Sequence, residues 1–197
     1  MLCLIMTAGV DMYRSIPNAR KTMSGKNKNK VITIVVPAYN EEKSIEQTII
    51  HLRSISSKLK KINCQLKIFI VNDGSSDGTE SMAIRAGADK IVKHKVNLGL
   101  GAAVRSGLGA AYKDGSDIAI KFDADLQHDP EDIIELIKPI IADEADIVYG
   151  MRFGNLQYKM PFMRRAGNYV FTKLMKFLTG WPLQDSQPGI FAVNRDY

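Results

Sequence analysis

Two aspartates with an i, i+2 spacing could bind a metal ion. Asp123 and Asp125 directly follow the apolar run over residues 118–122, and the amide Gln127 comes next at the same spacing. An extended strand places residues i and i+2 on the same side, so the two carboxylates point the same way if the strand continues that far. Carboxylates this close repel one another unless a cation lies between them. The pattern is typical of Mg²⁺ or Mn²⁺ shared with substrate phosphates. The alternative is a solvated acidic turn before a helix.

The elements that would position these aspartates alternate between strand and helix. Apolar, β-branched runs predict strands buried on both faces, and apolar residues at helical spacing predict helices between them. Strands are expected over residues 31–36, 66–71, 90–93, 118–122, 146–150 and 190–193, and helices over 44–61, 79–86, 102–112, 129–140 and 169–178. This alternation predicts a single α/β domain over residues 31–197, with a mostly parallel sheet flanked by helices.

Three polar clusters follow strands of this predicted sheet. They are residues 37–41, Asp73 and residues 123–127. Ligands bind beyond the carboxyl ends of the strands in parallel sheets. The three clusters should therefore converge on one edge, and that convergence favours a metal and phosphate site over an acidic turn.

Composition limits the class of protein. The chain has 197 residues, of which 45% are apolar and 24% charged, which is enough for one domain with a full core. The net charge of +6 permits an anionic partner but does not choose among nucleotide, phospholipid and nucleic acid. Cys3 and Cys64 show no metal-ligand spacing, so a reducing compartment is expected. No stretch reaches the ~18 apolar residues that a membrane span needs.

The two ends of the chain differ from its middle. Residues 1–30, which include the basic run 24–30, are expected to form a flexible leader. Residues 160–183 contain the predicted helix 169–178, whose broad aromatic and aliphatic face lies opposite a lysine face. Such a helix either lies in a membrane interface or covers the sheet. The natural protein is expected to continue past Tyr197.

Four motifs in order resemble a known family. They cover residues 35–42, 71–79, 97–102 and 123–130. Together they are similar to the family 2 glycosyltransferases with the GT-A fold, and among these to polyprenyl-phosphate glycosyltransferases such as the dolichol-phosphate mannose synthases. The resemblance extends over roughly residues 31–195.

The resemblance implies roles for individual residues. Metal binding falls to Asp125 and Gln127, with Mg²⁺ or Mn²⁺ as the ion. Arg152 and Arg165 would act with Asp125 in catalysis by recruiting the acceptor phosphate, unless they are ordinary surface arginines. Nucleotide binding involves Pro37, Tyr39, Glu41, Val71, Asp73, Asp123, Ala124 and Asp125. The segment 185–191 departs from the family motif, because Phe191 stands where that motif has Arg.

The implied function is an inverting, metal-dependent transfer of one mannose or glucose from GDP-mannose or UDP-glucose to a polyprenyl (dolichyl) phosphate. It would take place at the cytoplasmic face of a membrane, with no nucleic acid partner. A phosphate acceptor is already an anion and needs no general base. One alternative is a sugar or protein hydroxyl acceptor, for which His128 or Asp129 would be the nearest bases. Another is a non-catalytic domain that binds a nucleotide sugar.

Overall fold

A seven-stranded sheet forms the centre of the computed structural model, which describes residues 3–6, 29–125, 129–150 and 189–196. Among these residues the strand order is β1-β6-β7-β5-β2-β3-β4. β7 pairs antiparallel with β5 and β6, and the other pairings are parallel. The strands are β1 (Cys3–Met6), β2 (Lys30–Ala38), β3 (Cys64–Asn72), β4 (Lys90–Lys93), β5 (Ile118–Lys121), β6 (Ile147–Gly150) and β7 (Ile190–Asn194).

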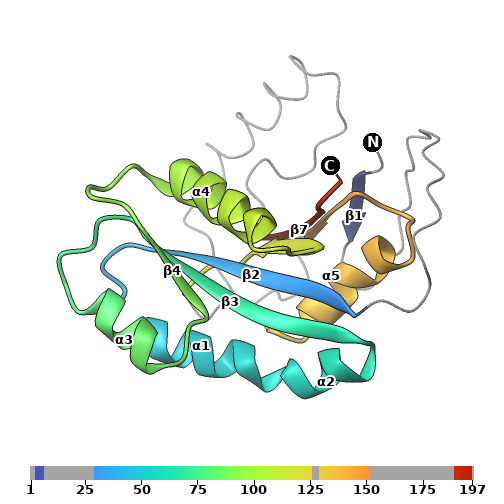
Figure 1. Cartoon of the computed structure of the whole chain (residues 1–197), viewed down its shortest axis with the longest axis horizontal. Helices are drawn as coiled ribbons and strands as arrows, with labels where there is room; N and C mark the ends of the chain where they lie inside the picture. The colour runs from blue at the N-terminus through green and yellow to red at the C-terminus, as the bar shows by residue number, and fades with distance from the viewer. Residues whose placement is uncertain (1–2, 7–28, 126–128, 151–188, 197) are drawn as a thin grey trace, which may run out of the picture.

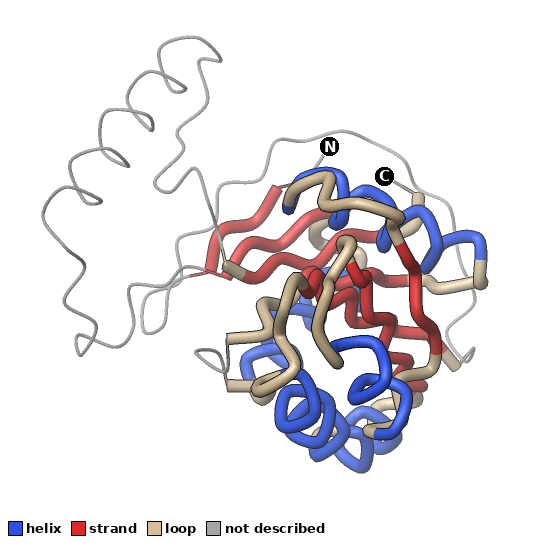
Figure 2. The backbone as a smooth tube through the Cα atoms, turned by 90° about the vertical axis from the view of Figure 1, so that its left-hand side faces the viewer, coloured by secondary structure: helices blue, strands red, loops and turns tan. Residues whose placement is uncertain are grey.

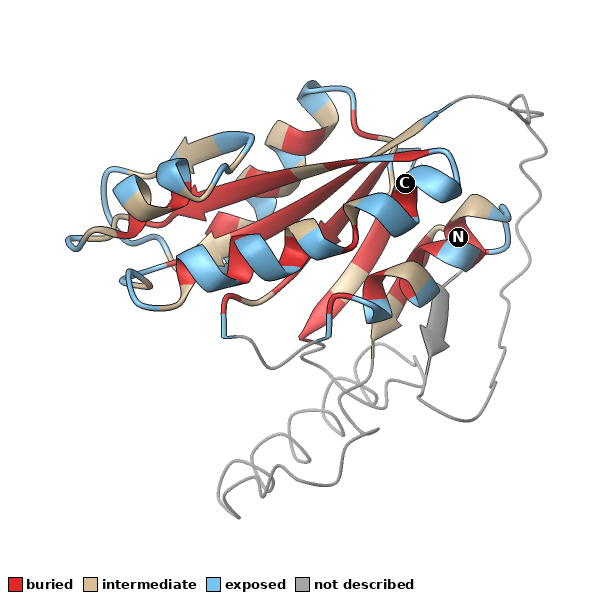
Figure 3. Ribbon diagram, turned by 90° about the horizontal axis from the view of Figure 1, so that it is seen from below, coloured by how far each residue is buried: buried red, intermediate tan, exposed pale blue. Residues whose placement is uncertain are grey.

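Helices cover both faces of this sheet, as Figures 1 and 2 show. The helices are α1 (Ile45–Ser54), α2 (Ser56–Lys61), α3 (Thr79–Arg85), α4 (Leu100–Lys113) and α5 (Asp132–Ile141). α4 packs on one face over Val35 and Phe69, while α1 and α5 pack on the other over Ile32 and Ile34. The strands between the layers are buried along most of their length (Figure 3). These observations confirm the predicted α/β architecture with a mostly parallel sheet.

Two predictions about the elements are wrong. Cys3–Met6 is not part of a flexible leader, because it pairs parallel with β6 as strand β1. Four residues are too few to show a period, and their partner lies more than a hundred residues later in the chain. The single helix predicted over residues 44–61 is two helices, α1 and α2, which meet at the buried Ile55. Serines on both sides of Ile55 weaken the helix there, because their hydroxyls compete for backbone hydrogen bonds.

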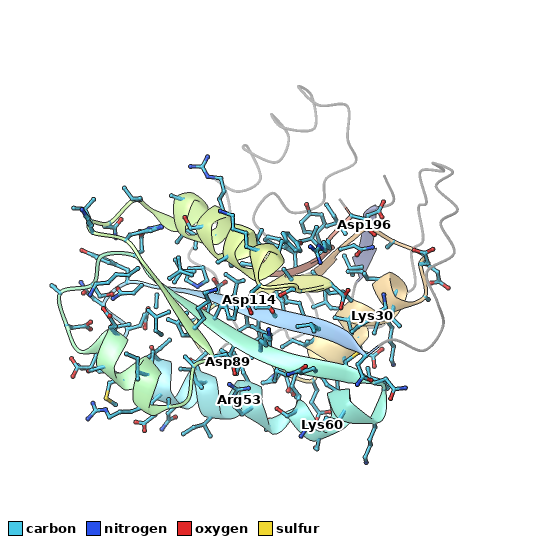
Figure 4. All side chains as sticks on the ribbon, in the orientation of Figure 1. Lys30, Arg53, Lys60, Asp89, Asp114 and Asp196 are labelled. Carbon is cyan, nitrogen blue, oxygen red and sulfur yellow. The ribbon has the colours of Figure 1, made fainter. Side chains whose placement is uncertain are left out.

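Ion pairs attach the helices and strands to one another away from the polar loops. Arg53 of α1 lies 2.6 Å from Asp89, which precedes β4, and Figure 4 shows the two residues facing each other. Asp89 also accepts a hydrogen bond from the Ile68 N–H at 2.6 Å. These contacts fix α1 and β4 relative to β3.

The strands β2, β3 and β4 run in the same direction. Lys30, at the start of β2, lies on the right in Figure 4, and the loops that follow the three strands gather on the left in Figure 1. β5 is parallel to β2, so its carboxyl end lies at the same edge. None of the helices in the described ranges is both long and apolar enough to span a bilayer.

Candidate functional site at the carboxyl edge of the sheet

The pairing of three strands brings the predicted polar clusters together. Val35 of β2 pairs with Lys121 of β5, and Ala38 of β2 pairs with Asn72 of β3. Both ladders continue past the strands, because the Phe122 N–H donates to the Val35 carbonyl and the Asp73 N–H donates to the Ala38 carbonyl, at 3.0 and 2.9 Å. Tyr39, Asp73 and Asp123 therefore leave three adjacent strands at one edge.

The loop after β2 is hydrogen-bonded to the loop after β3. Asn40 adopts a left-handed conformation with φ 56°, and its side-chain oxygen accepts from the Ser76 N–H at 2.9 Å. The next residue, Glu41, donates its N–H to the Thr79 hydroxyl at 2.8 Å. Asn tolerates this backbone conformation better than most residues. The contacts hold Tyr39 at the edge with 49% of its surface exposed.

Asp73 is buried beneath the loop that precedes α4. Its carboxylate accepts from the Leu98 N–H at 2.9 Å and the Gly99 N–H at 2.8 Å, and it lies 2.6 Å from His94 Nδ1. Burial alone would raise the pKa of Asp73, but hydrogen bonds from His94, Leu98 and Gly99 outweigh it and hold the pKa below its usual range. The observed role of Asp73 is thus to fasten this loop, and its contact with a nucleotide stays a prediction.

His94 extends this network to α4. Its second ring nitrogen, Nε2, lies 2.9 Å from the Ser106 hydroxyl. The sequence carries no signal for this role, because the partners of His94 lie 12 and 21 residues away. His94 thus links Asp73, directly after β3, to Ser106 in the middle of α4.

A close backbone contact brings two of the loops together. Gly74 has φ +74°, and a Cβ there would lie 2.4 Å from the Val96 carbonyl carbon. Real Cβ atoms do not approach backbone this closely, so the position requires Gly. The loop after β3 is thereby pressed against the loop after β4.

The turn with the two aspartates is held from two neighbouring elements. The Ala124 carbonyl accepts from the Thr48 hydroxyl of α1 at 3.1 Å, and Ala124 is buried. Asp123 lies 2.5 Å from the ammonium of Lys121 on β5. Asp125 is exposed to solvent. The two aspartates thus occupy different environments although they are one residue apart.

Lys121 is a second residue that the sequence does not reveal. It reads as one polar position within an apolar run, yet it is only 4% exposed. In the sequence, the only indication of its role is that it lies two residues before Asp123.

The described part of the edge fits a cation held mainly by its substrate. No cluster of three or more His, Cys, Asp or Glu side chains is present in the residues that the structure describes. Mg²⁺ commonly takes only one or two protein carboxylates and completes its shell with phosphates and water. The exposed carboxylate of Asp125 suits that arrangement. The other predicted ligand, Gln127, and the predicted acceptor-binding residues Arg152 and Arg165 lie outside the described residues.

A comparison with protein families decides the assignment. The family described as Glycosyl transferase family 2 matches residues 33–197. The chain belongs to this family. The resemblance drawn from the four sequence motifs is therefore confirmed, and the GT-A fold expected from it agrees with the observed sheet and helices.

Curated relatives of this family 2 glycosyltransferase chain include two named for lipid phosphates. The UDP-N-acetylglucosamine–dolichyl-phosphate N-acetylglucosaminyltransferase of Methanococcus voltae is 34% identical, with 85% of this chain and 70% of the relative covered. The polyprenol monophosphomannose synthase of Mycolicibacterium smegmatis is 28% identical, with 92% and 70% covered.

Solved structures similar to this chain contain metal and nucleotide. The glucosyl-3-phosphoglycerate synthase of Mycobacterium tuberculosis, crystallised with Mn²⁺, UDP-glucose and phosphoglyceric acid, has a TM-score of 0.64 and 25% identity. The same enzyme with Mg²⁺ and UDP has a TM-score of 0.59 and 26% identity. Both alignments include 85% of this chain and 57% of the chain in the solved structure. The chain thus spans just over half the length of these structures.

Proposed function

We propose that this chain is the transferase domain of an enzyme that moves one sugar from a nucleoside diphosphate donor to a polyprenyl phosphate. The observation that carries the proposal is the convergence of three polar loops at one edge of the sheet, with the exposed Asp125 among them. Relatives named for dolichyl and polyprenyl phosphates support the acceptor. Mannose from GDP-mannose and glucose from UDP-glucose remain the two donors expected from the sequence.

The loops after β2 and β3 would bind the nucleoside. Tyr39 exposes its ring at the edge and can stack on a base. Pro37 and Glu41 would act on either side of Tyr39, and Val71, which pairs with Pro37, and Asp73, which follows β3, would contribute from the neighbouring strand. Asp123 and Ala124 would lie nearer the ribose and the diphosphate, because they follow the neighbouring strand β5.

The diphosphate would be held with a divalent cation at Asp125 and Gln127. When bound, Mg²⁺ or Mn²⁺ supplies Lewis-acid stabilisation of the negative charge that the leaving nucleoside diphosphate gains. Asp125 contributes a carboxylate from a turn that Thr48 fixes through the Ala124 carbonyl. The residues therefore orient the leaving group before the bond to the sugar breaks.

The acceptor phosphate would attack the anomeric carbon from the side opposite the leaving group, which inverts the configuration at that carbon. The phosphate is already an anion, so positioning replaces proton abstraction. We assign that positioning to Arg152 and Arg165. A lipid acceptor also places the reaction at a membrane surface, and we propose its cytoplasmic face.

A hydroxyl acceptor is the second candidate. The solved structures similar to this chain are named glucosyl-3-phosphoglycerate synthase, which names a product of low molecular weight. A hydroxyl would need a general base, for which Asp129 is the nearest described candidate. A domain that binds a nucleotide sugar without turnover is the remaining alternative.

One assay separates these functions. The protein is incubated with Mn²⁺, a panel of radiolabelled nucleotide sugars and a short polyprenyl phosphate, and the label is partitioned between water and organic solvent. Label in the organic phase supports the proposal, and hydrolysis of the donor without lipid product favours a hydroxyl acceptor. Nucleotide binding without turnover would exclude both enzymatic functions.

Replacement of Asp125 by Asn tests the metal-binding carboxylate. Because the side chain is exposed, the variant should fold normally and lose at least ~10²-fold in metal-dependent turnover. The matched control is Glu135→Gln on α5, which removes the same charge from a site whose side chain is exposed and should leave turnover unchanged. Wild-type turnover in Asp125→Asn would remove Asp125 from the metal site.

A further inference from the structure

Lys121 is an unusual residue for the interior of a sheet. Among the residues that the structure describes, only Lys121 and Asp73 are buried and formally charged. Lys121 ends β5, two residues before Asp123, and its side chain is 6% exposed. Burial of an ammonium lowers the stability of the folded state unless a counter-charge and hydrogen bonds compensate for the lost hydration. The contacts of Lys121 therefore show which groups compensate for the burial of its charge.

The ammonium of Lys121 joins two strands. Its Nζ donates to the Gly189 carbonyl at 2.7 Å, directly before β7, and lies 2.5 Å from the Asp123 carboxylate. β7 runs antiparallel to β5, so Gly189 lies at the same edge as the aspartates. The Asp123 side chain is 20% exposed, so the ion pair is shielded from most of the solvent.

This ion pair separates the two aspartates electrostatically. The negative charge of Asp123 is balanced by Lys121 within the protein, whereas Asp125 is exposed to solvent. Two neighbouring carboxylates would otherwise repel each other or share a cation. With Lys121 in place, a metal ion at the pair would have to compete with the ammonium for Asp123.

We propose that Lys121 is a positioning residue that withholds Asp123 from the metal, so that Asp125 is the only carboxylate of the pair that binds it. The proposal rests on the proposed function, because it concerns the same metal and nucleotide site. It adds that a lysine of β5 gives two chemically identical side chains, Asp123 and Asp125, different roles in the site.

Binding of Mn²⁺ alone tests the proposal without any turnover. Free Mn²⁺ is measured by electron paramagnetic resonance while the metal is titrated into each variant. In Lys121→Met, the buried ammonium no longer competes with the metal for Asp123, so Mn²⁺ should bind about tenfold more tightly. The double variant Lys121→Met/Asp123→Asn should return to the wild-type affinity.

Two controls make the comparison specific. Lys138→Met removes the same charge from an exposed position on α5, so its Mn²⁺ affinity should equal that of the wild type. Asp123→Asn alone should also leave the Mn²⁺ affinity unchanged, because Lys121 already holds Asp123, while Asp125→Asn should weaken it. This second comparison decides the question even if Lys121→Met does not fold.

Two results would overturn the proposal. One is equal Mn²⁺ affinity of the wild type and a folded Lys121→Met, including no detectable binding by either. The other is a loss of affinity in Asp123→Asn as large as in Asp125→Asn. Sugar transfer by the wild type is measured separately, so a protein that shows the expected Mn²⁺ pattern without transfer refutes the proposed function and not the role of Lys121.

Discussion

Asp73 shows how one buried carboxylate can build a loop. Its two oxygens accept hydrogen bonds from the Leu98 and Gly99 N–H groups, and His94 Nδ1 lies 2.6 Å from Asp73 Oδ1. Leu98 and Gly99 belong to no strand, so their N–H groups have no partner in the sheet ladder. The Asp73 carboxylate accepts these N–H groups instead. A neutral side chain cannot do the same, because an amide nitrogen would face an N–H donor.

The pKa of Asp73 predicts a dependence of stability on pH. Because the folded pKa is lowered, Asp73 contributes stability above the unfolded pKa of about 3.9 and loses it as the pH falls toward the folded value. Asp73→Asn should cost about 2 kcal/mol or more at pH 7, where a buried hydrogen-bond network is broken. The variant should also lose less stability than the wild type between pH 5 and pH 3. Urea unfolding at these pH values measures both effects. Equal stability at pH 7 would contradict the first, and parallel pH profiles would contradict the second.

At this scale the sequence identifies exposed chemistry better than buried chemistry. Asp123 and Asp125 are recognisable because their spacing and their place after a strand are local properties. His94 and Lys121 are not, because their roles depend on Ser106 and Gly189, which only the folded chain brings near. A lone histidine or a lysine in an apolar run has the same appearance with or without such partners.

Helix α4 packs on the sheet through small residues. Ala103, Gly107 and Ala111 recur every four positions and are buried against β2 and β3. A Cβ at Gly107 would lie 2.2 Å from a methyl of Val35 and 2.8 Å from a methyl of Val71. Both methyls belong to stiff, β-branched side chains, so the helix would have to move outward.

Two glycines of this helix form a matched pair of substitutions. Gly107→Ala should destabilise the protein by about 1–3 kcal/mol, because it overpacks the contact with Val35. A Cβ at Gly109 would meet no atom of another described element within 4 Å, so Gly109→Ala should stabilise the helix by up to about 1 kcal/mol. Chemical denaturation of both variants measures the difference. Equal effects in the two variants would mean that α4 is not held this close to the sheet.

The elements themselves follow from local patterns in most of the chain. The buried β-branched run of β2 and the apolar stripe of α5 are both recognisable in the sequence. Cys3–Met6 is not, because a strand of four residues is stabilised by its pairing with β6 and not by its own pattern. The break at Ile55 is also hidden, since the apolar spacing continues through it into α2.

At the scale of the whole molecule, β6 and β7 are the described strands that border the segment 151–188 in the chain. Gly150 ends β6 and pairs with Ile190 at the start of β7. β6 and β7 meet at the edge where Asp125 lies, because β5 pairs antiparallel with β7. An acceptor bound beside Gly150 and Ile190 would therefore lie at the edge that carries the proposed donor site.

The predicted helix 169–178 within this segment lies outside the described residues, and its apolar face gives a test of membrane contact. If this face enters the membrane–water interface, Phe171→Ser/Phe177→Ser should reduce binding to anionic vesicles at least ~10-fold. The reason is that the variant transfers two fewer aromatic side chains from water into the membrane. Co-sedimentation measures this binding. The control Ile50→Ser/Ile84→Ser changes two aliphatic residues of α1 and α3, each 59% exposed, and should bind as the wild type does. Loss of the folded state in the phenylalanine variant would instead mean that the helix packs on the sheet, and unchanged binding would place the membrane contact elsewhere.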